Sequence, residues 1–190
     1  MQKPLYPESE ARADLLILHP PAGIAGGDHL SIRVRLEPGA QVRITTPGAA
    51  KWYRSRGAEA RQTLHLHVAD NANLEWLPQE AIVFDGARVR TETEIACTET
   101  SRACGWDLWM LGRSAAGEQF KHGHVHQRLS LRRGVRLLWS ERVRLAADDP
   151  LLRSPLGWQG AHVVGSYWAL GLPNDESLIE RCREVAEPGV

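Results

Sequence analysis

Residues 29–44, HLSIRVRLEPGAQVRI, alternate apolar and polar side chains on both sides of a Pro-Gly pair at 38 and 39. Alternation with a period of two predicts half-buried strands, and the Pro-Gly pair predicts a turn that joins them into a hairpin. A second stretch of the same design, TLHLHVADNANLEWL, occupies residues 63–77 and turns at Asp70 and Asn71. The fold class is therefore expected to rest on strands.

The two stretches superpose at an offset of 32 residues, which places Ile32, Val34, Leu36, Ala40, Val42 and Ile44 on Leu64, Leu66, Val68, Ala72, Leu74 and Trp76. A fixed period predicts stacked, solenoid-like units that each bury a face on the next. The alternative is a meander in which two similar hairpins arise by chance.

Further alternating segments follow at 87–97, 122–145 and 161–170, whereas residues 174–187 carry a helical pattern with Asn174 or Asp175 as its cap. A short helical turn is also expected near 148–152. We expect a mainly β fold of stacked antiparallel sheets, solenoid-like or sandwich-like, with a helix near the C-terminus.

The composition limits the classes of partner. The 190 residues include 23 basic and 23 acidic side chains, so no net field draws nucleic acid or an acidic membrane surface. Cys97, Cys104 and Cys182 are odd in number and lack C-x-x-C spacing, which is typical of thiols in a reducing compartment. Without a long apolar run, the expected location is the cytoplasm. The seven tryptophans fit either a core or a partner interface.

The loop LHPPAGIAGGDHL, residues 18–30, has the glycine density of a phosphate-binding loop. It lacks the Lys-Ser/Thr of a P-loop, it leads into a strand instead of a helix, and Asp28 would repel phosphate. Nucleotide binding is therefore excluded for this loop. Its shape is expected to depend on Pro20, Pro21, Gly23, Gly26 and Gly27.

Motifs of catalysis are absent from the sequence. GRSAAG at 112–117 misses the nucleophile-elbow spacing by one residue, and neither H-E-x-x-H nor C-x-x-C occurs. The sequence therefore predicts a protein that is not an enzyme.

The run KHGHVH places His122, His124 and His126 at alternate positions, so a strand would project all three from one face about 7 Å apart. Neighbouring imidazoles can share nickel or zinc, and the alternative is a solvated strand face. A second pair, His65 and His67, has no close acidic neighbour in the sequence.

Two carboxylates, Asp107 in CGWDLWML and Glu141 in RLLWSERVRL, lie in apolar surroundings. Such a group must be paired, hydrogen-bonded, protonated or exposed to a water-filled cavity. An ion pair with Arg142 or another arginine remains the structural alternative.

Seven segments, in order, resemble the urease accessory protein UreD (UreH) family: QKPLYPE, LHPPAGIAGGD, TTPGAAKWYRS, LEWLPQEAIVFDGA, WDLWMLGR, GEQF and ERVRL. They lie between about Gln2 and Gly171. The resemblance implies a single UreD-like domain over residues 1–190 that is incomplete at both ends, because family members begin earlier and continue further.

The resemblance also implies a function. The family consists of scaffolds that act with UreF and the GTPase UreG to deliver nickel to the urease apoprotein, through a water-filled channel. The resemblance assigns Asp28, Asp107 and Glu141 to the lining of the channel. Carboxylates there would bind nickel loosely while it passes through. The resemblance implies no tightly bound cofactor. The tryptophan-rich segments and the C-terminal region would bind UreF. The alternative function is a β-rich metal-binding or hydrolytic domain that uses His122, His124 and His126.

Overall fold

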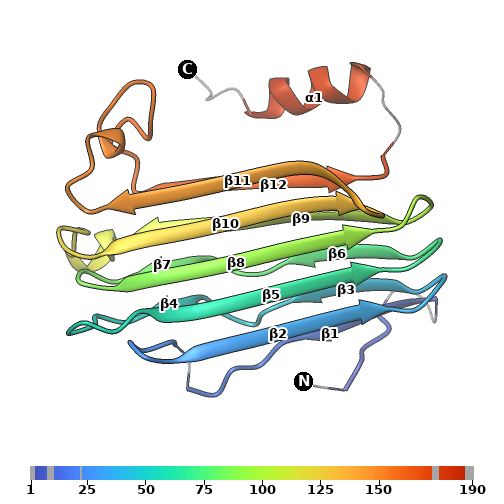
Figure 1. Cartoon of the computed structure of the whole chain (residues 1–190), viewed down its shortest axis with the longest axis horizontal. Helices are drawn as coiled ribbons and strands as arrows, with labels where there is room; N and C mark the ends of the chain where they lie inside the picture. The colour runs from blue at the N-terminus through green and yellow to red at the C-terminus, as the bar shows by residue number, and fades with distance from the viewer. Residues whose placement is uncertain (1–2, 8–10, 22, 173–175, 187–190) are drawn as a thin grey trace.

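The computed structural model describes residues 3–7, 11–21, 23–172 and 176–186. Within these residues the chain forms twelve strands, two 3-10 helices and one α-helix. The strands build two sheets that lie one behind the other (Figure 1). The mainly β class and the stacking of the sheets are confirmed.

The front sheet has five strands among the described residues. Their order is β11 (Arg136–Ala146), β10 (His124–Arg133), β8 (Arg88–Cys97), β5 (Ala60–Val68) and β2 (His29–Leu36). Apolar and polar residues alternate along β5 and β8, so that Leu64, Leu66 and Ile95 face the second sheet while their neighbours face outward.

The back sheet is built around β9 (Arg102–Leu111). One edge of β9 pairs with β6 (Asn73–Leu77) and with β7 (Ala81–Val83), and the other edge pairs with β12 (Val163–Leu170). Further out lie β3 (Gln41–Thr45), β1 (Arg12–Leu16) and β4 (Ala50–Trp52).

The chain winds between the two sheets as a solenoid. It passes from β2 in front to β3 and β4 behind, returns to β5, and repeats this course through β6, β7, β8, β9 and β10 (Figure 1). The winding stops at β11, which turns back antiparallel to β10, and β12 then closes antiparallel on β9.

The repeat of 32 residues is the register of the solenoid. Ile32 pairs with Leu64 and Val34 with Leu66 in the front sheet, while Val42 pairs with Leu74 behind. The apolar positions that superpose in the sequence are thus neighbours on successive turns, and the stacked alternative is confirmed over the meander.

The expectation of hairpins and antiparallel sheets was wrong for most of the strands. Eight of the ten strand pairs among the described residues are parallel, and β2 and β3 lie in different sheets. At the Pro-Gly turn the N–H of Gly39 donates to the carbonyl of Asp70, on the next turn of the solenoid. The sequence pattern missed this because alternation is the same whether a strand pairs with its hairpin partner or with its repeat.

The core between the sheets consists of two clusters. One includes Leu66, Val68, Leu74 and Ile95 toward the ends of the long front strands. The other includes Val83, Val89, Leu111, Val125 and Leu145 toward their beginnings. Trp52, Trp76, Trp109 and Trp168 are buried in these clusters, so that most of these large rings serve the core.

The helical expectations are confirmed where the structure describes them. Helix α1 (Glu176–Ala186) lies beyond β11 and β12 (Figure 1), and its expected cap at 174 or 175 lies outside the described residues. Of the 3-10 helices η1 (Ser114–Ala116) and η2 (Pro150–Leu152), the second is capped by the carboxylate of Asp149. Among the described residues, no helix has the length and apolarity of a membrane span.

Candidate functional site

A row of polar side chains crosses the interior of the front sheet. Gln62 on β5 pairs in register with Thr91 on β8, and Thr91 pairs with Gln127 on β10. Most of their inward neighbours along each strand, such as Leu64, Val89 and Leu129, are apolar and buried, and Thr93 on β8 is a buried polar exception. This polar row separates the two core clusters, and so the interior is not a continuous apolar layer.

A cavity of about 250 Å³ lies at the polar row, between the sheets. Gln62, Thr91 and Gln127 line it from the front sheet, and Asp107 lines it from β9. Three buried polar atoms of its walls have no hydrogen-bond partner among the described residues: Trp52 Nε1, Thr91 Oγ1 and Trp109 Nε1. Such atoms are normally satisfied by water when protein groups are out of reach, so the walls suit a hydrated interior.

Asp107 is the charged group of this cavity. Burial raises its pKa to about 6 and the charge of Glu141 adds to the rise, while a hydrogen bond from Gln127 Nε2, 3.2 Å from Asp107 Oδ2, opposes it. The carboxyl group is therefore ionised at neutral pH and takes up a proton in mildly acidic conditions.

Glu141 lies close to Asp107 but does not line the cavity. It pairs with the buried Leu129 across β10 and β11, so it lies on the inward face of the sheet, whereas Arg142 lies on the outward face. Among the ion pairs of the described residues, none joins Asp107 or Glu141 to an arginine. The ion pair with an arginine, which was the structural alternative for these two carboxylates, is therefore not found among the described residues.

The glycine-rich loop contributes to the cavity wall through His19, Gly23 and Ile24. A Cβ on Gly23 would overlap the ring of Tyr53 and lie 2.8 Å from the carbonyl oxygen of Lys51. Only glycine therefore lets this loop pack so closely against the chain at 51–53.

The rest of the loop turns the chain. A Cβ on Gly26 would overlap the hydroxyl of Ser55, and Gly27 has a φ of 97°, in the region that favours glycine. Pro20 and Pro21 form an exposed turn. These residues therefore allow the turns and close contacts of the backbone in this loop.

Asp28, which the family resemblance assigned to the channel lining, is not among the residues that line this cavity. Its carboxylate turns back and accepts a hydrogen bond of 2.9 Å from the N–H of Ala25. A carboxylate bound in this way stabilises the turn, and its place in the channel lining stays a prediction.

The three histidines of KHGHVH do not form one group. His122 lies outside β10, next to Asp85, whose Oδ1 accepts hydrogen bonds of 2.8 Å from the N–H groups of Lys121 and His122. Gly123 separates it from the strand with a φ of 100°. This corner of the chain turns His122 away from the other two.

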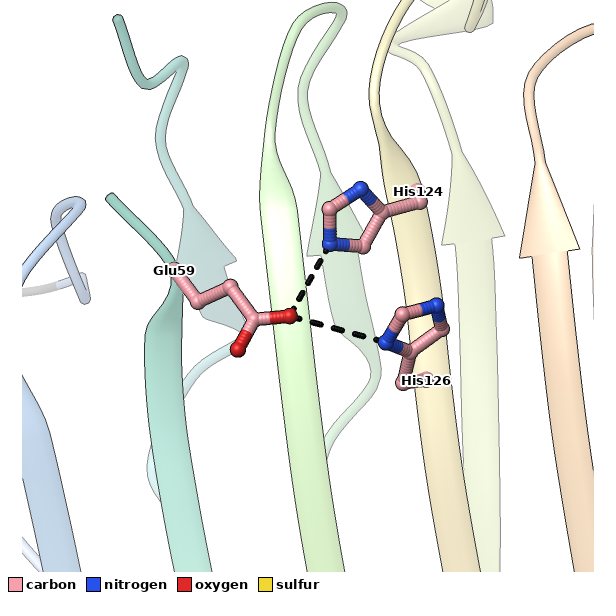
Figure 2. A group of neighbouring side chains, drawn as sticks. All are labelled: Glu59, His124 and His126. Carbon is pink, nitrogen blue, oxygen red and sulfur yellow. Dashed lines mark hydrogen bonds and ion pairs between the residues drawn. The ribbon is translucent and has the colours of Figure 1, made fainter. Parts of the chain in front are cut away.

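His124 and His126 project from β10 on the outer face of the front sheet and converge on Glu59 (Figure 2). His124 Nε2 lies 3.1 Å and His126 Nδ1 3.5 Å from Glu59 Oε1, and the two rings stack at 4.5 Å. Glu59 precedes β5, so the cluster reaches across β8, which lies between (Figure 2).

Arg90 on β8 completes this cluster. Its Nε donates to Glu59 Oε2 at 2.9 Å. The pKa of Glu59 falls to about 2, first because of this bond and then, with burial opposing, because of the contact with His124. Burial lowers the pKa of His126, and the positive charges of His124 and Arg90 lower it further.

Sequence reasoning missed Glu59, Gln127 and Thr91. Glu59 is 65 positions from His124, and only the parallel order of β5, β8 and β10 brings them together. Thr91 and Gln127 were detectable as polar residues at inward positions of alternating strands. The second histidine pair, His65 and His67, is exposed on β5.

Comparison with known proteins gives a consistent family. The profile described as UreD urease accessory protein matches residues 1–189. The urease accessory protein UreD of Dechloromonas aromatica is 48% identical over 191 residues, which covers 97% of this chain and 65% of that protein. The UreD proteins of Nitrosococcus oceani and Pseudomonas aeruginosa are 47% and 48% identical and are covered over 64% and 65% of their lengths.

The chain thus spans just under two thirds of the length of these three relatives, while nearly all of its own residues are matched. Identity at this level along nearly the whole chain, together with the family profile, establishes the family. The chain belongs to the UreD urease accessory protein family.

Proposed function

We propose that this chain is a urease maturation factor: a non-enzymatic scaffold of the cytoplasm that binds UreF, UreG and the urease apoprotein and conducts nickel toward the urease active site. Membership of the UreD family supports the role in urease maturation. The resemblance to the family implies the named partners and the transfer of nickel to the urease. It also assigns GTP binding to UreG and not to this chain.

The observation that carries the proposal is Asp107 in the wall of a cavity with polar groups on both sheets. A buried carboxylate without a cationic partner is costly in an apolar core, and contact with water removes most of that cost. Oxygen ligands hold nickel less tightly than imidazole or thiolate does, so one carboxylate with water suits passage better than storage. Asp107 serves as a transient negative partner for the passing ion.

The experiment replaces the carboxylate of Asp107 by the neutral amide of asparagine, which has a similar shape. Urease apoprotein is matured with UreF, UreG and either this chain or its Asp107→Asn variant, and the nickel content of the urease is measured by mass spectrometry. We expect less nickel per urease with Asp107→Asn, while its co-elution with UreF stays unchanged and its melting temperature at neutral pH is no lower than that of the unmodified chain.

Asp70→Asn serves as the matched control, because Asp70 lies in an exposed turn outside the cavity and accepts a bond from the hydroxyl of Thr100. The control should deliver nickel as the unmodified chain does. Full nickel content with Asp107→Asn would contradict transit past this carboxylate, and a loss of UreF binding with unchanged nickel per bound complex would assign Asp107 a structural role.

A further inference from the structure

We propose that Glu59, His124 and His126 form a binding site for a divalent transition-metal ion, such as Ni²⁺ or Zn²⁺, on the outer face of the front sheet. The site is separate from the cavity of the proposed function. His126 points outward from β10, while the next residue, Gln127, points inward and lines the cavity. The sheet itself therefore lies between the two.

The spacing of the three ligand atoms fits an ion of this size. Glu59 Oε1, His124 Nε2 and His126 Nδ1 all lie within 4.8 Å of one another. Ligands about 2.1 Å from a metal are separated by about 3.0 Å at right angles and by about 3.4 Å in a tetrahedron. The two contacts of Glu59 Oε1, 3.1 and 3.5 Å, match these separations (Figure 2).

The protein also holds the ligands ready. Arg90 Nε binds Glu59 Oε2 and so orients the carboxylate with Oε1 toward the imidazoles, as outer partners of metal ligands commonly do. Strand β10 thus places two of the three ligand side chains, and the bond to Arg90 places the third, before any ion binds.

The surroundings select the class of metal. Arg90 and Arg61 both contact Glu59, and Arg144 acts on His126. These positive charges disfavour Mg²⁺ or Ca²⁺, which depend on several anionic oxygens, whereas imidazole nitrogens favour Ni²⁺, Zn²⁺ or Cu²⁺. All three ligand side chains are partly exposed, so an ion can enter and leave from solvent.

The test is calorimetric titration of the full chain with NiCl₂ alone, compared with the double variant His124→Gln, His126→Gln. We expect the double variant to bind one Ni²⁺ fewer per chain, and Glu59→Gln to bind the corresponding ion more weakly. His122→Gln is the matched control, since His122 belongs to the same run but contacts Asp85. It should bind as many ions as the unmodified chain.

Melting curves with and without Ni²⁺ guard against a folding defect: the ion should raise the melting temperature of the unmodified chain more than that of Glu59→Gln. If the double variant does not fold, His126→Gln alone, which loses the longer contact, decides the stoichiometry. Equal binding by the unmodified chain and the double variant, or an equal loss in His122→Gln, would overturn the site. Neither result depends on whether Asp107 conducts nickel.

Discussion

Asp107 is a buried acid whose surroundings favour the protonated form. A raised pKa in the folded state means that its contribution to stability is complete below about pH 4 and is lost as the pH rises through about 6. Asparagine cannot ionise, so Asp107→Asn removes this dependence on pH and leaves that of the other groups unchanged.

The free energy of unfolding of the unmodified chain should therefore fall, relative to that of Asp107→Asn, by up to about 3 kcal/mol between about pH 4 and about pH 7. Urea denaturation of both proteins across this range measures the difference. A difference that does not vary with pH would show that the folded chain does not raise the pKa of Asp107.

Gly123 is the second residue whose identity the structure explains. Its φ is 100°, and a Cβ there would overlap the carbonyl oxygen of Ala87 and lie 3.0 Å from its carbonyl carbon. It sets the corner that brings the chain into β10 and separates His122 from His124.

Gly123→Ala should lower the free energy of unfolding by about 1–3 kcal/mol through backbone strain, with the steric overlap in addition. Gly117 offers the comparison, because its φ is 71° and a Cβ there would have nothing within 4 Å. Chemical denaturation should show the larger loss for Gly123→Ala, and equal losses in both variants would rule out the contact with Ala87 as the cause.

At the scale of elements, β11 differs from the strands below it. It pairs with β10 on one edge, and its first half exposes Leu137, Leu138 and Trp139, the last of these over 56% of its surface. Exposed aromatic and apolar residues in a row are typical of a surface that binds another protein. Of the tryptophans whose role the sequence left open, Trp139 is the one that fits an interface.

Trp139→Ala should weaken co-elution of the chain with UreF and leave its melting temperature nearly unchanged, because an exposed ring contributes little to the core. Size-exclusion chromatography of the mixed proteins measures the effect. Leu156→Ala removes a side chain that is 96% exposed outside β11 and should leave co-elution intact. Unchanged co-elution of Trp139→Ala would exclude β11 as the UreF surface.

At the scale of the whole molecule, the stacked turns support one another only through their neighbours. Leu66 on β5 is in register with Val34 on β2 and with Ile95 on β8, and it is almost fully buried. Removing its side chain leaves a cavity in contact with three successive turns.

Leu66→Ala should lower the free energy of unfolding by about 2–5 kcal/mol. Val135→Ala, at a side chain that is 98% exposed, should change it by less than about 0.5 kcal/mol. Thermal and urea unfolding of the two variants test the expectation, and a loss below about 1 kcal/mol for Leu66→Ala would be inconsistent with a solenoid core at this position.

The sequence predicted what depends on local pattern. Periodicity and capping within short windows predicted the alternating segments, the offset of 32 residues, helix α1 and the turn at η2. They did not predict β1, β4, β7 or β9. Parallel pairing could not be predicted in this way, because it depends on whether the strand after a turn enters the same sheet or the other one. The hydrogen bond from the N–H of Gly39 to the carbonyl of Asp70 joins this turn to the next turn of the solenoid, and a local sequence pattern does not show it.

The candidate sites were predictable to the same extent. Asp107 stood out as a carboxylate in an apolar stretch, and the structure places it in the wall of a cavity. The grouping of His124 and His126 with Glu59, and the departure of His122, required the order of the strands and the corner at Gly123. The family resemblance, and no local pattern, assigned Asp28 to the channel lining, and its bond from Ala25 could not be read from the sequence.

The proposed passage of nickel through a hydrated interior depends on the polar row. Thr91→Val and Gln127→Leu together keep the approximate volume of the row but remove hydrogen-bonding groups that water needs on β8 and β10. The measurement is the nickel content of urease matured with this double variant. We expect a folded chain that still binds UreF and yields urease poor in nickel. Urease with its full nickel content would contradict passage through the hydrated interior.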